Sequence, residues 1–282
     1  MGKPDSGTEP AEKRVEILGV RVSAVDLVTA TDMIEGWIKR RERRYVCVTG
    51  AHGVMEARGN PQLRDIHNAA GLVTPDGMPL VWVARLLGWK VIRRVYGPDL
   101  MRRLTDVSAR RGYRQFYYGG APGVAEKLRA ALTAANPGLV VCGTFCPPFR
   151  PLGAEEDQSV VDTINAARPD ILWLGLSTPK QERWMAEHLG RIEASVMIGV
   201  GAAFDFLAGV KPQAPVWMQR NGLEWVFRLC CEPRRLWRRY AYIVPSFAGL
   251  AAAMLLRHAM GVIATRLAAV PVPGARPPSS AA

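Results

Sequence analysis

The sequence predicts an α/β fold with a mostly parallel sheet and helices on both of its faces. Short apolar runs alternate along the chain with segments of helical periodicity, as in proteins built from repeated strand–helix units. Several runs are apolar at every position, which is typical of parallel strands buried on both faces. With 282 residues, of which 49% are hydrophobic and 22% charged, the chain is long enough for one such domain and an appendage.

Strands are expected wherever a short apolar run occurs, and helices between them. The expected strands are residues 16–22, 45–49, 71–74, 91–95, 115–118, 140–142, 171–175 and 196–200. The expected helices include residues 24–41, 78–87, 99–111, 124–134, 155–167 and 180–189. In open parallel sheets, ligands bind beyond the carboxyl ends of the strands. The loops that follow the strands are therefore where binding and catalytic residues are expected.

Composition divides the chain into four parts. Residues 1–14 form a polar lead and residues 268–282 a tail rich in Pro, Ala and Ser, and both are expected to be disordered. Residues 15–212 carry the alternating pattern of the core. Residues 213–267 interleave apolar, aromatic and basic side chains, and we expect them to form a helical appendage on the core.

The appendage concentrates the positive charge of a chain whose formal net charge is +12. Seven basic and two acidic residues lie within residues 211–240, together with Trp217, Trp225 and Trp237. Arginine combined with tryptophan suits either nucleic acid or lipid headgroups. The sequence has no helix-turn-helix, zinc-finger or RRM pattern, so no nucleic-acid partner is expected.

An apolar run at residues 241–256 favours a membrane surface as the anionic partner. Pro245 and Ser246 interrupt the run and Arg257 follows it, so it falls short of the roughly 18 residues needed for a membrane span. We expect the segment to lie in the membrane interface, with the neighbouring basic residues on an anionic leaflet. A helical hairpin that only covers the core is the alternative.

Two loops after expected strands offer proton-transfer groups. Asp76, in TPDGMP, stands between a strand and a helix, where it could act as a general base or simply cap the helix. Thr49 and His52, in VTGAHG, follow another strand, and the histidine could serve as a base or a phosphate partner. An ordinary turn with an ordinary histidine is the simpler explanation of this second loop.

Two further loops could contact a phosphorylated ligand. Gly119 and Gly120 lie between a strand and a helix, where they could let a phosphate approach backbone N–H groups or merely form a tight turn. Lys180 and Gln181 follow the strand at 171–175, and a lysine and an amide there suit a diphosphate and sugar hydroxyls. A GxGxxG fingerprint is absent, which argues against a nucleotide-dependent oxidoreductase or epimerase.

No metal cofactor is expected. The five cysteines include no CxxC pair, and no matching Cys or His pair completes a zinc site. The sequence also has no DxD-type carboxylate pair that would hold a divalent cation with a nucleotide. Free thiols in a cytosolic protein are the simplest interpretation of the cysteines.

These stretches, in this order, resemble the WecG/TagA/CpsF family (glycosyltransferase family 26) over roughly residues 15–245. The resemblance is carried by TPDGMPLVW, RRVYGPDL, YYGGAPGVAEKL, PDILWLGLSTPKQERW, GVGAAFDFLAG and QAPVWMQRNGLEWVFRLCCEPRRLWRRY. It implies a Rossmann-like core and a C-terminal appendage that closes the site and meets the membrane. It also implies transfer of a hexose or N-acetylhexosamine, such as N-acetylmannosamine, from a UDP-sugar to an undecaprenyl-diphosphate-linked sugar. Such an enzyme acts in cell-surface polysaccharide biosynthesis, peripherally on the cytoplasmic face of the bacterial membrane.

The resemblance also implies roles for individual residues. Asp76 matches the proposed general base of the family, and Thr49 matches its threonine after the preceding strand. Arg94 matches an arginine proposed to hold the donor diphosphate, and Gln181 matches the glutamine of PKQE. The basic residues that would face the lipid diphosphate match Arg228, Arg234 and Arg235. Many members carry asparagine two residues after the threonine, where this chain has Ala51 and then His52, so His52 is a candidate substitute in donor binding.

Residue patterns alone leave an alternative from another functional class. A non-catalytic basic adaptor, at a membrane surface or on nucleic acid, would share the charge and the aromatic side chains of the appendage. An exposed appendage face would also suit homo-oligomer formation when no membrane is present.

Overall fold

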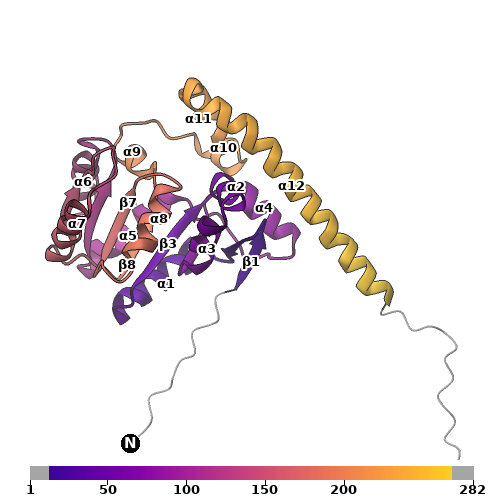
Figure 1. Cartoon of the computed structure of the whole chain (residues 1–282), viewed down its shortest axis with the longest axis horizontal. Coiled ribbons are helices and arrows are strands. Elements are labelled where there is room, and N and C mark those ends of the chain that lie inside the picture. The colour runs from indigo at the N-terminus through magenta and orange to yellow at the C-terminus, as the bar shows by residue number, and fades with distance from the viewer. Residues whose placement is uncertain (1–12, 269–282) are drawn as a thin grey trace, which may run out of the picture.

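The computed structural model describes residues 13–268, with side chains through residue 264. Six parallel strands form the central sheet in the order β4-β3-β8-β7-β5-β6. Figure 1 shows this sheet enclosed by helices. Their bounds are β3 Arg44–Thr49, β4 Leu72–Pro75, β5 Arg114–Gly119, β6 Val140–Phe145, β7 Ile171–Gly175 and β8 Val196–Gly199. The predicted α/β class is therefore confirmed. Most of the lead and the tail expected to be disordered lies outside the described residues, although Arg14 already begins a strand.

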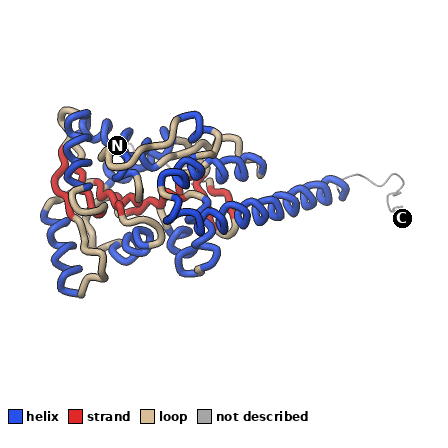
Figure 2. The backbone as a smooth tube through the Cα atoms, turned by 90° about the horizontal axis from the view of Figure 1, so that it is seen from above, coloured by secondary structure: helices blue, strands red, loops and turns tan. Residues whose placement is uncertain are grey.

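Helices cover both faces of the sheet, as the sequence predicts (Figure 2). On one face lie α1 Leu27–Arg40, α5 Gly97–Arg111, α6 Val124–Ala135 and the short α9 Ala203–Leu207. On the other lie α2 Ala51–Gly59, α3 Pro61–Ala69, α4 Met78–Leu86, α7 Ala154–Ala166 and α8 Lys180–His188. Strand residues alternate between the two layers, so Tyr117 packs in the first core and its neighbours Phe116 and Tyr118 pack in the second.

The prediction of one strand at residues 16–22 is wrong. The segment is a hairpin of β1 Arg14–Ile17 and β2 Val20–Ser23, joined by Leu18 and Gly19. Both turn residues have positive φ, 51° and 92°, the geometry of the tight turns that follow the twist of a hairpin. The sequence hid the turn because an apolar leucine occupies a position that usually holds Asn, Asp or Gly.

The prediction of a strand at residues 91–95 is also wrong. Ile92 and Val95 are fully buried, yet the segment is an extended loop between α4 and α5. Its backbone forms isolated hydrogen bonds to residues distant in sequence: Val95 N donates to Pro75 O at 2.9 Å, and Arg93 N donates to Val25 O at 3.1 Å. Burial by tertiary contacts, rather than strand pairing, explains why Ile92 and Val95 are apolar, whereas Val91 is exposed.

The helix α2 occupies residues that were expected to be a loop carrying His52. Its glycines and histidine conceal the helical pattern, and α3 follows after Asn60, whose side chain caps it by accepting from Leu63 N at 3.0 Å. Gly53 is needed in α2 because an added Cβ would lie 2.9 Å from Cγ2 of Thr49. The helix therefore sits tightly against the end of β3.

The appendage consists of α10 Val216–Arg220, α11 Glu224–Cys231 and the long α12 Pro233–Ala268, which runs past the core (Figure 1). Ile243, Phe247 and Ala251, spaced four residues apart, bury one stripe of α12 in the core. The helix continues through Arg257, where the sequence analysis ended the apolar run. By length and composition, the helix over residues 233–264 could cross a membrane, and most of its 18-residue apolar window is exposed. The sequence-based conclusion that no segment reaches this length is therefore corrected.

Candidate active site

The neighbouring strands β3 and β4 bring Thr49 and Asp76 together. The register pairs Thr49 with Pro75, and Asp76 N donates to Thr49 O at 3.0 Å. Both residues lie at the carboxyl end of the sheet, where ligands of open α/β folds bind. The Thr49 hydroxyl is buried and donates to Cys47 O at 3.3 Å, so this side chain fixes the strand end.

The carboxylate of Asp76 does not cap the helix that follows it. The cap residue of α4 is Gly77, and Asp76 Oδ1 instead accepts from Gly97 N, at the start of α5, at 3.0 Å. Burial and the negative charge of Glu224 raise the pKa of Asp76 to about 6, against the opposing effects of Arg94, the Gly97 N–H and Arg228. A carboxylate with a pKa near 6 is ionised at neutral pH and binds a proton more readily than an ordinary aspartate.

Arg94 connects this carboxylate loop to the appendage. Its Nε donates to Asp76 O at 2.6 Å, one terminal nitrogen donates to Gln219 Oε1 at 3.2 Å, and the other contacts Glu224 Oε2 at 2.5 Å. The side chains of Arg94 and Glu224 are only 14% and 19% exposed, so solvent screens their ion pair weakly. The guanidinium also lies 3.9 Å above the ring centroid of Tyr96, whose hydroxyl donates to Glu224 Oε1 at 2.9 Å.

Sequence reasoning missed Glu224 as a functional residue. It is one of the two acidic residues in the basic stretch 211–240, and that isolation was the available signal. Its carboxylate accepts from both Arg94 and Tyr96, so it fastens α11 over the loop that holds Asp76.

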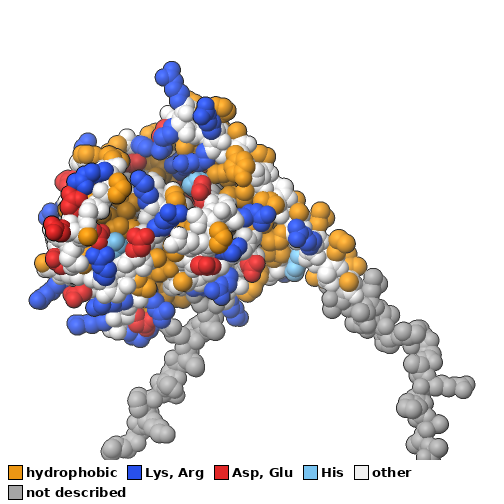
Figure 3. Space-filling view, in the orientation of Figure 1, with side chains coloured by type: hydrophobic (Ala, Val, Ile, Leu, Met, Phe, Trp, Pro, Cys, Tyr) orange, Lys and Arg blue, Asp and Glu red, His pale blue; other side chains and the backbone are white. Residues whose placement is uncertain are grey.

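The appendage also brings positive charge toward the site (Figure 3). Arg228 on α11 lies 5.9 Å from the ring of Phe206 and lowers the pKa values of both Asp76 and His52. The pKa of His52 is lowered mainly by burial and next by the positive charge of Arg239. His52 Nε2 also lies 3.4 Å from Glu56 Oε1. Asp76, His52, Arg228 and Arg239 thus share one electrostatic environment.

The two other predicted acceptor residues lie farther along the appendage. Arg234 and Arg235 are exposed in the first turn of α12, and Arg235 forms an ion pair with Glu232. In the part of the chain that the structure describes, no hydrogen bond or ion pair joins either of them to the Asp76 loop.

Among the predicted donor-binding residues, Lys180 is exposed and Gln181 is buried. Gln181 is 2% exposed, and its amide nitrogen donates to Glu182 Oε1 at 3.1 Å while its Oε1 has no partner among the described residues. A Cβ on Gly199 would lie 2.9 Å from Cδ of Gln181, so the amide is packed beneath the end of β8. Gln181 therefore lies inside the fold rather than projecting from the mouth of the sheet.

Gly119 and Gly120 form a tight turn between β5 and α6. Both have positive φ, and a Cβ on Gly119 would lie 2.9 Å from the carbonyl carbon of Gly175. Close packing of two strand ends is therefore sufficient reason for Gly119. A contact between these glycines and a phosphate stays a prediction.

Comparisons with known proteins identify the family. The model of the "Glycosyl transferase WecG/TagA/CpsF family" matches residues 15–260. The chain is 30% identical over 184 residues to the N-acetylglucosaminyldiphosphoundecaprenol N-acetyl-beta-D-mannosaminyltransferase of Bacillus spizizenii, covering 65% of this chain and 69% of that protein. It is 25% identical over 227 residues to the Staphylococcus aureus protein of the same name, covering 80% and 87%. The adaptor alternative is thereby excluded, and the chain belongs to the WecG/TagA/CpsF family of glycosyltransferases.

Proposed function

We propose that this glycosyltransferase moves an N-acetylhexosamine, such as N-acetylmannosamine, from a UDP-sugar to a sugar carried on undecaprenyl diphosphate. The names of the relatives support the transferred sugar and the acceptor class. The observation that carries the proposal is the half-buried Asp76 carboxylate, with a pKa raised to about 6, beside arginines from both the core and the appendage. This combination suits a base that works next to anionic diphosphates.

The proposed reaction is a single displacement with inversion. Asp76 takes the proton of the acceptor hydroxyl while that oxygen bonds to the anomeric carbon and the bond to the UDP oxygen breaks. Negative charge grows on the leaving diphosphate, and Arg94, with the exposed Lys180, stabilises it. Gln181 is buried beneath the end of β8, so it is assigned no direct contact with the diphosphate. His52 contacts the donor, and the Gly119–Gly120 turn admits its phosphates to backbone N–H groups. The reaction needs no metal, because the positive charges of Arg94 and Lys180 offset the negative charge of the leaving diphosphate.

The appendage would hold the lipid-linked acceptor. Arg228, Arg234 and Arg235 bind its diphosphate, and α12 meets the cytoplasmic face of the membrane, where the protein is peripheral. The long apolar exposed surface of α12 supports this placement. The same surface would mediate homo-oligomer formation in detergent-free solution, which the molecular mass measured by light scattering would reveal.

The direct test is UDP release from a panel of UDP-sugars, with and without a short polyprenyl-diphosphate sugar. Release from one donor only when the acceptor is present would establish the proposed reaction and name the sugar. Release that does not depend on the acceptor, or binding of a different nucleotide-sugar in place of UDP-sugars, would contradict it.

Glu224→Gln is expected to shift the acid limb of the pH–rate profile to lower pH. The negative charge of Glu224 raises the pKa of Asp76, so its removal makes Asp76 easier to ionise. In wild type the rate of transfer should fall as the pH drops through about 6, because a protonated Asp76 cannot accept a proton.

The matched control for this profile is Glu232→Gln. Glu232 is an appendage carboxylate that pairs with Lys211 and Arg235 and, among the described residues, forms no hydrogen bond or ion pair with the Asp76 loop. Identical acid limbs for wild type, Glu224→Gln and Glu232→Gln would show that the limb does not report Asp76.

A further inference from the structure

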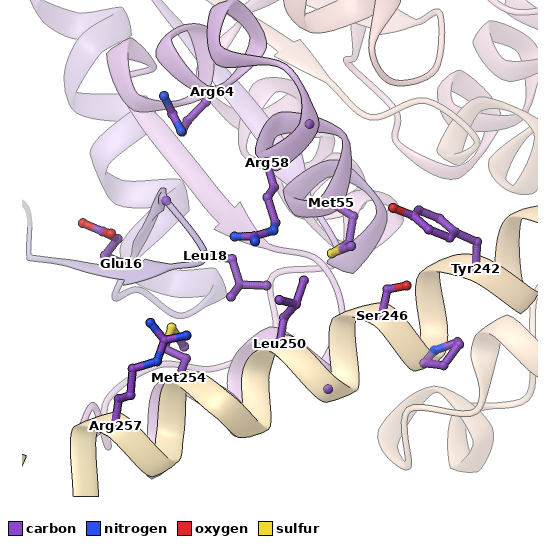
Figure 4. A pocket seen from close by; sticks show the side chains of 14 residues that line it. Glu16, Leu18, Met55, Arg58, Arg64, Tyr242, Ser246, Leu250, Met254 and Arg257 are labelled. Carbon is purple, nitrogen blue, oxygen red and sulfur yellow. The ribbon is translucent and has the colours of Figure 1, made fainter. Parts of the chain in front are cut away.

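A groove separates the middle of α12 from the core, away from the Asp76 loop (Figure 4). Its volume is ≈ 960 Å³, and it lies between α12, the end of α2, the start of α3 and the turn of the β1–β2 hairpin. His52 lies in the first turn of α2 at the candidate active site and Arg58 in its last turn at the groove, about 9 Å along the helix axis by the rise per residue. The groove is therefore a second site, beyond the function proposed above.

The floor of the groove is apolar. Leu18, Met55, Leu250 and Met254 line it and come from the hairpin turn, α2 and α12 (Figure 4). Leu18 holds a φ of 51°, a conformation that leucine rarely adopts, and Figure 4 shows its side chain beside Leu250. Methionine side chains are flexible and suit a surface that adapts to irregular chains. This floor is matched to hydrocarbon rather than to a water-soluble ligand.

The rim of the groove is positively charged. The rim is lined by Arg58 of α2, Arg64 of α3 and Arg257 of α12. In the described part of the chain, none of these arginines has a carboxylate within ion-pair distance. Other exposed arginines do have such partners, as Arg110 has in Asp106 and Arg150 in Glu156. The one acidic residue of the lining is Glu16. Three arginines that line one groove without a paired carboxylate are suited to a phosphate, which accepts bidentate hydrogen bonds from arginine.

The helix that closes the groove points to a membrane as the source of that phosphate. Leu256, Met260 and Ile263 follow the groove on α12 and are exposed, and the helix has the length and composition of a membrane-contacting segment. We propose that the groove binds an anionic phospholipid, with its phosphate among Arg58, Arg64 and Arg257 and an acyl chain along Leu18, Leu250 and Met254. A lipid bound there would bridge α12 and the core, and would make membrane attachment depend on anionic lipid.

The test is cosedimentation of the full chain with vesicles of phosphatidylcholine alone or with phosphatidylglycerol added. The double variant Arg58→Gln/Arg64→Gln changes only the core side of the groove. Its affinity for phosphatidylglycerol vesicles should fall about 25-fold, from roughly fivefold for each basic residue near an anionic surface. The control, Arg110→Gln/Arg129→Gln, removes the same charge from α5 and α6, on the other face of the sheet, and should change the affinity far less. Equal losses in the two double variants would overturn the site.

Leu18→Asn separates a lipid from a soluble phosphate. Asparagine suits the positive φ of the hairpin turn, so the fold should tolerate it, while it makes the floor of the groove polar. We expect weaker vesicle binding and unchanged binding of glycerol phosphate. Wild-type vesicle binding by Leu18→Asn would show a site for the phosphate group alone and overturn the lipid proposal. UDP release with a short soluble acceptor should be normal in all these variants, so failure of the groove and failure of the proposed reaction are distinguishable.

Discussion

Asp76→Asn is expected to lower the rate of sugar transfer by about 10²–10⁴-fold, the range of a general base. Asparagine can still accept the hydrogen bond from Gly97 N, so the loop should keep its shape while losing the group that takes the proton. The measurement is kcat for acceptor-dependent UDP release. A matched control is Asp99→Asn, which removes an exposed carboxylate that pairs with Arg102 in the first turn of α5.

The stability of Asp76→Asn distinguishes catalysis from folding. The folded-state pKa of Asp76 lies above its ordinary value of 3.8, so its ionised form is disfavoured by the fold at neutral pH. Removing that charge should leave Tm at pH 7 unchanged or higher. Near-normal turnover would remove Asp76 from the mechanism, and a collapse of Tm would attribute the loss of activity to misfolding.

Arg94→Gln is expected to lower kcat/KM by about 10²–10³-fold, the effect of removing one donor to charge that develops in the transition state. It should also reduce stability, because breaking a buried ion pair leaves Glu224 without its cation and costs about 3–5 kcal/mol at full burial. Since the pair is partly exposed, a smaller loss is expected here. Arg93→Gln is the neighbouring control, because Arg93 is exposed and, among the described residues, its guanidinium donates hydrogen bonds to backbone carbonyls alone.

A double variant decides whether Arg94 acts on the substrate or through the appendage. In Arg94→Gln/Glu224→Gln no charge is left unpaired, so stability should recover relative to Arg94→Gln. If Arg94 contacts the leaving group, the rate should stay low. Recovery of both rate and stability would make Arg94 a positioning residue that only fastens α11.

The strands that the sequence predicted best are the fully buried ones. The expected runs at 45–49 and 171–175 correspond to β3 and β7, since strands covered on both faces are apolar throughout. Residues 91–95 were also expected to form a strand but pair with none, because the burial of Ile92 and Val95 does not depend on strand hydrogen bonds. The turn at Leu18 and Gly19 was missed for a similar reason: an apolar residue in the sequence does not reveal that the backbone turns there.

Some features of the candidate site could be predicted from the sequence and others could not. The position of Asp76 after a strand could be predicted, because strand–loop–helix order is local. The raised pKa of Asp76 could not be predicted, because one of its causes is Glu224, which lies on a helix nearly 150 residues later in the chain. The resemblance pointed to Arg94, but it could not show that the guanidinium already binds Asp76 O, Gln219 and Glu224.

The sequence by itself determined the α/β class, the strand-end position of Asp76 and the basic, aromatic character of the appendage, because each depends on local periodicity and composition. The tertiary structure alone decided that Glu224 fastens α11 beside Asp76 and that Gln181 is buried. It also decided that Arg58, Arg64 and Arg257, from three different helices, line one groove with an apolar floor. Burial and charge act through distances in space, and those distances exist only once segments far apart in the chain have packed together.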